Sequence, residues 1–492
     1  MSLVSLTFII FLLILMLMYY LLPKSWQWVI LLCGSVCFYI LSSTWWTIGY
    51  VIISVVTIYL GTLLMEKAPK YKKGIYIVTL LINLGLMCTL KFTSLIPSLG
   101  ISFYALQMIG YLTDCYWGMS EREKNIGKVA LFNIYFPQMV SGPISRYRQI
   151  GTQLIVAHSF DGMRIRLGVY RIFVGFFKKL MVSEHLSALT DYLFKSYESY
   201  GGIFIWIGTG LYVVQLYADF SGCMDIVLGA SECFGITLPE NFNRPFEAVS
   251  IQEIWQRWHI TLGTFLKDYV MYPILRTKAF TSMTTFIKTK WGKKAAKNIP
   301  TILSMLVLWL CMGIWHGFGF NFVGEGLWFW AIIAISTLLA KTFKNAKDKL
   351  RIDAKSPRWM AFCRVRTAFL FAIGMLFFKA ASLKAAISML ISAFNPMAIK
   401  ASCMKLLPAL VELEGNIGAN NIVWPAVAVI IGIIFMTLLS NMEAKDKSVI
   451  NIVASLGFKR RLVVLWVLFI MIVLLGAYGP GYSASEFIYG GF

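Results

Sequence analysis

The stretch from Leu308 to Trp330 reads LWLCMGIWHGFGFNFVGEGLWFW, two apolar runs separated by a short Gly-containing turn. About 20 mostly apolar residues are enough for a helix to cross a bilayer. Gly317 and Gly319 interrupt the apolar pattern directly after Trp315 and His316. We therefore expect two membrane helices joined by a tight turn, with a histidine at the end of the first.

The rest of the chain has the same character. It has 492 residues, of which 58% are hydrophobic and 14% charged, whereas soluble domains are about 45–50% apolar and about 25% charged. These values exclude soluble, disordered, collagenous and disulfide-scaffold proteins and predict an all-α polytopic membrane protein. About eleven full spans are expected, and shorter or weaker segments at 129–141, 165–182 and 223–238 predict partial, re-entrant or interfacial helices. The full spans are expected near 5–22, 27–42, 45–65, 74–92, 101–117, 203–219, 300–316, 322–340, 366–380, 422–440 and 462–478.

The net charge of +22 has its simplest explanation in the enrichment of Lys and Arg in cytoplasmic loops. No basic stripe with interleaved aromatic residues lies outside the apolar segments, so no nucleic-acid partner is expected. We expect the segments 66–73, 276–297, 341–366 and 459–461 to be cytoplasmic loops, and segment 381–421 to lie outside. Counting spans from these loops places both termini outside a cell membrane. Residues 2–22 are interpreted as a retained span, not a signal peptide.

The middle third is more polar than the rest. Segment 161–185 mixes Arg and Lys with apolar residues, a pattern typical of a helix at the inner membrane interface. Segment 241–275 is too polar to face lipid, and such segments persist at membrane depth only around a protein-enclosed cavity. We expect a central polar chamber ringed by helices. One integral membrane domain would comprise N-terminal helices (1–128), a core (129–330) and C-terminal helices (331–492).

Two of the four histidines are candidates for chemistry. His316 at the end of a span is costly to bury and suited to proton transfer, although a structural histidine is the alternative. If residues 254–269 form a helix, Trp255, Trp258 and His259 share a face and could form a water-excluding pocket. An interfacial aromatic anchor is the alternative there. The nine cysteines form no C-x-x-C pair, so buried thiols are expected and no metal site.

Several motifs together resemble the membrane-bound O-acyltransferases. They are FPQMVSGPISR, NFNRPF at 241–246, RWHITL at 257–262, WHG at 315–317 and the ending EFIYGGF. The similar branch contains alginate and peptidoglycan O-acetyltransferases and teichoic-acid D-alanyl transferases. The resemblance implies that His316 is the histidine of the family's W-H-G motif and His259 its second polar site. The sequence Ile274-Leu275-Arg276-Thr277-Lys278 departs from the alginate-type Leu-Gly-Gly-Asn-Arg, which leaves the acceptor open.

The resemblance implies a bacterial O-acyltransferase of the cell membrane. It would move an acyl group, expected to be acetyl, from a cytoplasmic thioester such as acetyl-CoA or an acyl carrier to a hydroxyl of an extracellular polysaccharide or cell-wall polymer. No bound cofactor is expected, and an extracytoplasmic acyltransferase- or esterase-like partner protein would complete the transfer. His316 would be the general base, and His259 would orient the donor or stabilise the oxyanion. The residues expected to line the substrate chamber are Asn241, Arg244, Trp255, Trp258 and Trp315.

Other functions remain open at this point. D-alanyl transfer to teichoic acid uses the same kind of thioester chemistry. A transporter or flippase would share the spans and the polar chamber, although no internal repeat is visible in the sequence. A structural scaffold for a polysaccharide synthase would tolerate the loss of His316.

Overall fold

The computed structural model describes residues 1–43, 47–92, 100–405, 423–443, 453–478 and 487–488. Within these ranges the regular elements are helices, and the only β-type pairing is a single bridge between Phe242 and Trp258. The protein is an all-α, multi-pass membrane protein, as the composition predicts.

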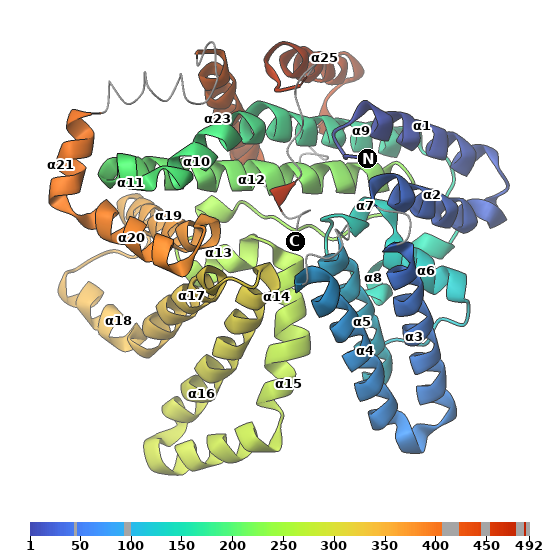
Figure 1. Ribbon diagram of the computed structural model, residues 1–492, viewed down its shortest axis with the longest axis horizontal. Coiled ribbons are helices and arrows are strands. Elements are labelled where there is room, and N and C mark those ends of the chain that lie inside the picture. The colour runs from blue at the N-terminus through green and yellow to red at the C-terminus, as the bar shows by residue number, and fades with distance from the viewer. Residues whose placement is uncertain (44–46, 93–99, 406–422, 444–452, 479–486, 489–492) are drawn as a thin grey trace. The chain divides into compact units, whose positions relative to one another are not determined.

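Contacts group the chain into two units whose segments alternate along the sequence, which Figure 1 colours by residue number. The first comprises residues 1–185, 216–240 and 423–492, and the second comprises 186–215 and 241–422. The helix α12 (Gly202–Glu232) contributes to both units. The three consecutive sections expected from the sequence, 1–128, 129–330 and 331–492, stay a prediction.

Each of the eleven predicted spans falls on a helix. Among the described residues, eight helices are long and apolar enough to cross a membrane, or nine if the bent pair Leu383–Phe394 and Pro396–Met404 is one span. The structure thus has fewer candidate spans than the eleven predicted, partly because α1 and α5, with 16 and 17 residues, are shorter than the 18 residues required of a candidate span. Residues 406–421 of the segment predicted to lie outside are not among those described.

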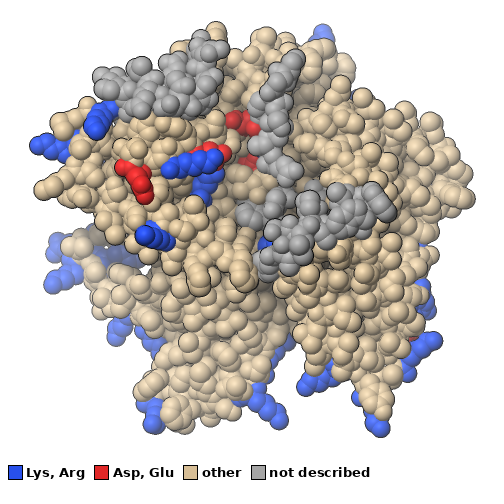
Figure 2. All heavy atoms as spheres, in the orientation of Figure 1, with Lys and Arg blue, Asp and Glu red and all other residues tan. Residues whose placement is uncertain are grey.

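The first unit contains the N-terminal helices. Its α3 and α4 form a hairpin whose tip carries Lys67, Lys70, Lys72 and Lys73. On the face drawn in Figure 2, Lys and Arg outnumber Asp and Glu, in keeping with the net charge. The helices are α1 (Leu6–Leu21), α2 (Gln27–Ser42), α3 (Ile48–Lys67), α4 (Lys72–Phe92), α5 (Ile101–Trp117), α6 (Ile126–Ile134), α7 (Phe136–Met139), α8 (Tyr147–Ile155), α9 (Gly162–Phe177), α23 (Val423–Glu443) and α25 (Phe458–Leu475).

The helix α9 packs directly against the backbone of α12. A Cβ added at Gly168 would lie 2.6 Å from the carbonyl oxygen of Gly229, and one added at Gly175 would lie 2.5 Å from that of Gly222. Small residues at such positions allow two membrane helices to approach closely. The segment 161–185 was predicted to lie along the membrane interface; most of its second half is buried within the first unit, and its position relative to a membrane stays a prediction.

Ion pairs explain how Lys179, in the second half of this segment, can be buried. A π-helical turn (Lys178–Ser183) follows α9, and the Lys179 ammonium lies 2.7 Å from Asp219 and 2.6 Å from Glu184 with no exposed side-chain surface. Asp219 also accepts a hydrogen bond from the backbone N–H of Ile488. Phe487 and Ile488, the described residues of the C-terminal motif EFIYGGF, therefore lie at this ion cluster.

The second unit contains a hairpin of two long helices, α16 (Lys278–His316) and α17 (Phe320–Leu338). Gly313 and Gly326 let the backbones approach, since an added Cβ would lie 2.5 Å and 2.4 Å from the carbonyl oxygens of Phe322 and Trp309. The other helices are α10 (Glu184–Lys195), α11 (Tyr197–Tyr200), α13 (Ile251–Arg257), α14 (Ile260–Leu266), a π-helical turn (Lys267–Met271), α15 (Tyr272–Leu275), α18 (Ala340–Lys349), α19 (Pro357–Lys379), α20 (Leu383–Phe394) and α21 (Pro396–Met404).

The basic segment 276–297, predicted to be a loop, is mostly helical. Thr277 caps α16 by accepting a hydrogen bond from the N–H of Phe280. Gly292, with φ 82° and ψ 174°, interrupts the helix. A positive φ is readily available to glycine, so the kink falls where the sequence permits it. Lysine is a good helix former, and for this reason a run of positive charge is not by itself a loop signal.

Candidate functional site

His316 is the last residue of α16 and is 1% exposed. Its Nδ1 atom lies 2.9 Å from Oε2 of Glu325, on the neighbouring helix α17. Glu325 is equally buried, and its second carboxylate oxygen has no hydrogen-bond partner among the described residues. A carboxylate accepts, so Nδ1 of His316 must donate, and Nε2 is then the lone-pair atom of the neutral ring.

The ends of three helices hold this pair in place. Gly317 is extended, and an added Cβ would lie 2.2 Å from the Phe322 ring, so the turn after His316 is tightly packed. Asn321 donates to the carbonyl oxygens of Phe377 and Ala380 and thereby ties the start of α17 to the end of α19. The Phe378 ring meets the imidazole edge-on, with 5.0 Å between centroids. The imidazole is therefore shielded from water on this side.

His259 lies between the short helices α13 and α14, is 2% exposed and has φ 47°. A left-handed conformation of a residue other than glycine costs about 1–3 kcal/mol and persists only where the surroundings impose it. The surroundings here are the segment 241–243. Asn241 accepts from the N–H of Ile260, and Asn243 donates to the carbonyl oxygen of Arg257.

The Asn241 side chain sets the proton position on His259. Its Oδ1 accepts from the N–H and the hydroxyl of Thr261, each at 3.0 Å, which identifies it as the amide oxygen. Nδ1 of His259 lies 3.3 Å from the same oxygen and must therefore be the protonated nitrogen. Burial lowers the pKa of His259 well below its usual range, and a proton on the nearby His316 ring would lower it further. His259 is thus neutral near pH 7, with its lone pair on Nε2.

Trp315 connects the two histidines. Its ring centroid lies 5.8 Å from that of His259 and 5.4 Å from that of His316. Trp315 is 6% exposed. The structure therefore brings together four of the predicted site residues in the second unit, namely His316, Trp315, His259 and Asn241.

Trp255 and Trp258 do not lie on one helical face with His259, so that prediction is wrong. The helix α13 ends at Arg257, and Trp258 is extended and pairs with Phe242. Both indoles instead pack against Phe371, at 5.8 Å and 5.2 Å between centroids. The helix is interrupted here because Asn241 and Asn243 make backbone hydrogen bonds with Ile260 and Arg257. These backbone groups would otherwise bond within a continuous helix.

Trp255 does line a cavity of about 290 Å³ with Trp309, Leu308 and Met312. Neither histidine is among its lining residues.

Arg244 lies elsewhere, 3.7 Å from Glu247 in a partly exposed ion pair. The same carboxylate pairs with Arg364 at 2.6 Å. Arg244 is thus part of a charge cluster with Glu247 and Arg364.

The sequence analysis missed Glu325. It is the only acidic residue between Asp268 and Asp348 and lies in an apolar run. An ionisable side chain within a membrane segment is costly and usually functional. That rule would have singled out Glu325. Among the described residues, no group of three His, Cys, Asp or Glu side chains is placed to hold a metal ion.

Comparison with known proteins gives this site a family context. Residues 125–288 match the membrane-bound O-acyltransferase family. Residues 125–288 therefore resemble a membrane-bound O-acyltransferase domain. The matched residues of this domain include Asn241, Arg244, Trp255, Trp258 and His259 but end before Trp315 and His316.

Individual relatives extend the similarity. Over 305 residues the chain is 30% identical to the probable alginate O-acetylase AlgI of Azotobacter vinelandii, covering 62% of this chain and 55% of that protein. It is 27% identical over 417 residues to the peptidoglycan O-acetyltransferase of Helicobacter pylori, covering 75% and 73%. It is 28% identical over 264 residues to the teichoic acid D-alanyltransferase of Bacillus subtilis, covering 52% and 62%. The chain thus matches only about half the length of the alginate O-acetylases.

Proposed function

We propose that the protein is an O-acyltransferase that moves an acetyl group from a cytoplasmic thioester to a hydroxyl of an extracellular polysaccharide or cell-wall polymer. The observation that carries this proposal is the buried His316–Glu325 pair beside Trp315 and His259. The family match and relatives named as acetyltransferases and an alanyltransferase support the same reaction class. A transporter would not require a carboxylate-oriented imidazole.

In the proposed reaction, Nε2 of His316 takes the proton of the acceptor hydroxyl as its oxygen attacks the thioester carbonyl carbon. The imidazolium that forms is stabilised by the Glu325 carboxylate at Nδ1. When the carbon–sulfur bond breaks, the ring returns the proton to sulfur, so that the products are an ester and a free thiol. Glu325 touches neither substrate and is a positioning residue.

His259 has an orienting role in this proposal. With the Nδ1 proton directed to Asn241, the neutral ring offers Nε2 as a hydrogen-bond acceptor. Such an atom could hold a hydroxyl or amide group of the acceptor or donor. An oxyanion needs a donor, so of the two roles expected from the sequence, orientation fits this tautomer better. Trp255 would contact substrate from its cavity, whereas Arg244 and Trp258 would stabilise the local fold.

The acyl group, the donor and the partner belong to the proposal as well. Acetyl transfer is favoured over D-alanyl transfer because both the alginate and the peptidoglycan relatives are named for acetylation. The acetyl group would come from acetyl-CoA or an acyl carrier, and an extracytoplasmic partner protein would pass it to the polymer. The site would lie in a bacterial cell membrane with both termini outside.

The experiment is thioester turnover by the purified protein. Acetyl-CoA, D-alanyl thioester and a small soluble hydroxyl acceptor are supplied in detergent, and release of free thiol is followed. Faster thiol release from acetyl-CoA than from the D-alanyl thioester supports the proposal, and the reverse order favours the D-alanyl alternative. Movement of the acyl compound across the membrane of proteoliposomes, without release of free thiol, would indicate a transporter.

A further inference from the structure

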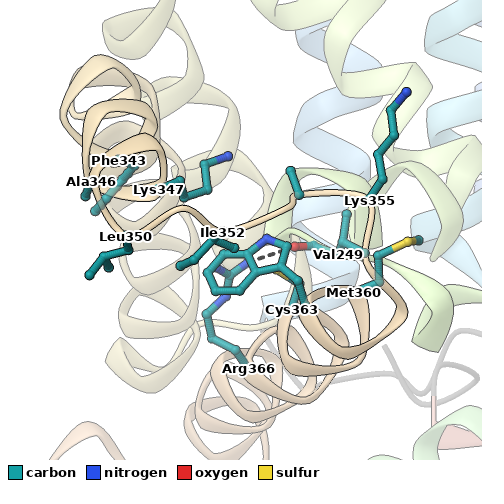
Figure 3. A pocket seen from close by; sticks show the side chains of 12 residues that line it. Val249, Phe343, Ala346, Lys347, Leu350, Ile352, Lys355, Met360, Cys363 and Arg366 are labelled. Atoms are coloured by element: carbon teal, nitrogen blue, oxygen red, sulfur yellow. Dashed lines mark hydrogen bonds between the residues drawn. The ribbon is translucent and has the colours of Figure 1, made fainter.

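A second cavity lies in the second unit, between α18 and the start of α19 (Figure 3). Its volume is about 640 Å³, within the range of about 300–1,000 Å³ typical of small-molecule sites. None of its lining residues belongs to the histidine site. A function of this cavity would therefore be separate from the acyl-transfer chemistry.

The helix α18 presents an apolar face to this cavity. Phe343, Ala346 and Leu350 recur at helical spacing, and all three line it. No residue of α18 is buried, so its apolar face is left uncovered by the rest of the described chain. Helices with one apolar face and one Lys-rich face lie at membrane surfaces. This face of α18 is therefore suited to contact with lipid chains.

Positive charge borders the same cavity. Lys347, Lys355 and Arg366 line it, and no acidic residue does. Arg366 donates to the carbonyl oxygen of Val249 at 2.8 Å, whereas Lys347 and Lys355 form no ion pair within the described residues. In Figure 3 Lys347 and Lys355 come from opposite sides of the lining, and both ammonium groups lie above Leu350 and Ile352 in the view.

We propose that this cavity binds one anionic phospholipid. The phosphate would contact Lys347 and Lys355, and an acyl chain would follow the apolar lining of Leu350, Ile352 and Trp359. Trp359 lies in the first turn of α19, a candidate span, and tryptophan is enriched where spans meet the headgroup region. Basic pockets beside membrane helices on the cytoplasmic side bind anionic headgroups, and segment 341–366 is predicted to be cytoplasmic.

A soluble anionic donor is the competing occupant. Its phosphates could meet the same lysines, but a water-soluble molecule would not require the apolar face of α18. The combination of one charged edge and one apolar wall matches an amphiphile more closely. The proposal does not depend on the acyl-transfer assignment, because binding is measured without turnover.

The test is lipid binding by the purified full chain in detergent micelles, measured by native mass spectrometry with phosphatidylglycerol and phosphatidylcholine. The variant Lys347→Gln/Lys355→Gln is compared with Lys344→Gln/Lys349→Gln. The second pair removes the same total charge, here from α18 alone, and does not line the cavity. Each lysine near a headgroup is worth about 1 kcal/mol, so we expect the cavity variant to lose phosphatidylglycerol affinity by about tenfold to thirtyfold.

The control variant should lose less than about threefold, and the wild-type chain should prefer phosphatidylglycerol over phosphatidylcholine. The variant Ala354→Trp keeps every charge and fills the cavity from an exposed position, and it should weaken binding as well. Equal losses in the two lysine pairs would show a diffuse surface attraction and overturn the proposal. Displacement of phosphatidylglycerol by millimolar acetyl-CoA would assign the cavity to a soluble donor instead.

Discussion

Nδ1 of His316 lies 2.9 Å from the carboxylate of Glu325, and both side chains are almost completely buried. This pair closes the α16–α17 hairpin at the point where the first helix ends. A buried carboxylate beside an imidazole fixes the ring tautomer and favours the protonated ring during proton transfer. The account of the site therefore depends on Glu325 as much as on the two histidines.

Replacement of Glu325 by Gln tests its positioning role. The amide oxygen can still accept from Nδ1, but the counter-charge for the imidazolium is lost. We expect the turnover number to fall about tenfold to hundredfold, within the contribution of general acid–base catalysis, with little change in KM. The acidic limb of the pH–rate profile should move to lower pH, and Glu325→Asp should restore part of the rate. An unchanged pH profile would indicate a purely structural role.

The lowered pKa of His259 predicts a pH-dependent stability. The unfolded chain takes up a proton on this ring near pH 6.5, whereas the folded chain resists protonation. The contribution of this group to the free energy of unfolding is therefore complete above about pH 6.5. It falls as the pH decreases, by about 1 kcal/mol over the first pH unit below that value.

The measurement is chemical unfolding in detergent between pH 8 and pH 5.5, for the wild-type chain and His259→Gln. The two should show the same pH dependence above about pH 7, and the variant should lose less stability below that value. Parallel curves over the whole range would contradict a neutral buried His259.

The glycine contact between α9 and α12 predicts a steric effect. Gly229→Ala would place a methyl group 2.5 Å from the Gly168 carbonyl oxygen, and overpacking of this kind costs about 1–3 kcal/mol. Gly210→Ala on the same helix meets nothing within 4 Å and should be neutral or slightly stabilising. Thermal unfolding in detergent compares them, and equal midpoints would argue against close helix packing.

Membrane orientation is tested by cysteine labelling in a variant without native cysteines. Single cysteines placed between 343 and 355 should resist a membrane-impermeant reagent in intact cells, because this basic segment is predicted to be cytoplasmic. Cysteines between 412 and 420, which are outside the described residues, should react. The opposite pattern would reverse the predicted orientation of the whole chain.

The sequence predicts the helices well, because apolar runs of spanning length leave few alternatives. It also locates His316 at a helix end, since Gly317 and Gly319 follow it directly. The break at Trp258 and His259 was not predictable from local signals, because no Gly or Pro marks it. It results from hydrogen bonds that Arg257 and Ile260 make with Asn243 and Asn241, which lie 14 and 19 positions earlier in the sequence.

Charge patterns were less informative than apolar patterns. Lys178 and Lys179 suggested an interfacial helix, but carboxylates distant in sequence neutralise them inside the first unit. The pairing of His316 with Glu325 depends on the tightness of the α16–α17 hairpin. The isolated acid was visible in the sequence, but which histidine it would meet required the fold.

The most direct test of the central claim is acyl transfer by purified His316→Asn, with His158→Asn as the matched control. An amide cannot take a proton at neutral pH, so we predict a loss of about 10²–10⁴-fold in rate with a normal thermal unfolding transition. The control, whose ring Nε2 lies 2.8 Å from the carbonyl oxygen of Gln153, should keep most of the wild-type rate. Substantial transfer by the folded His316→Asn variant would contradict the general-base role and the proposed function of the site.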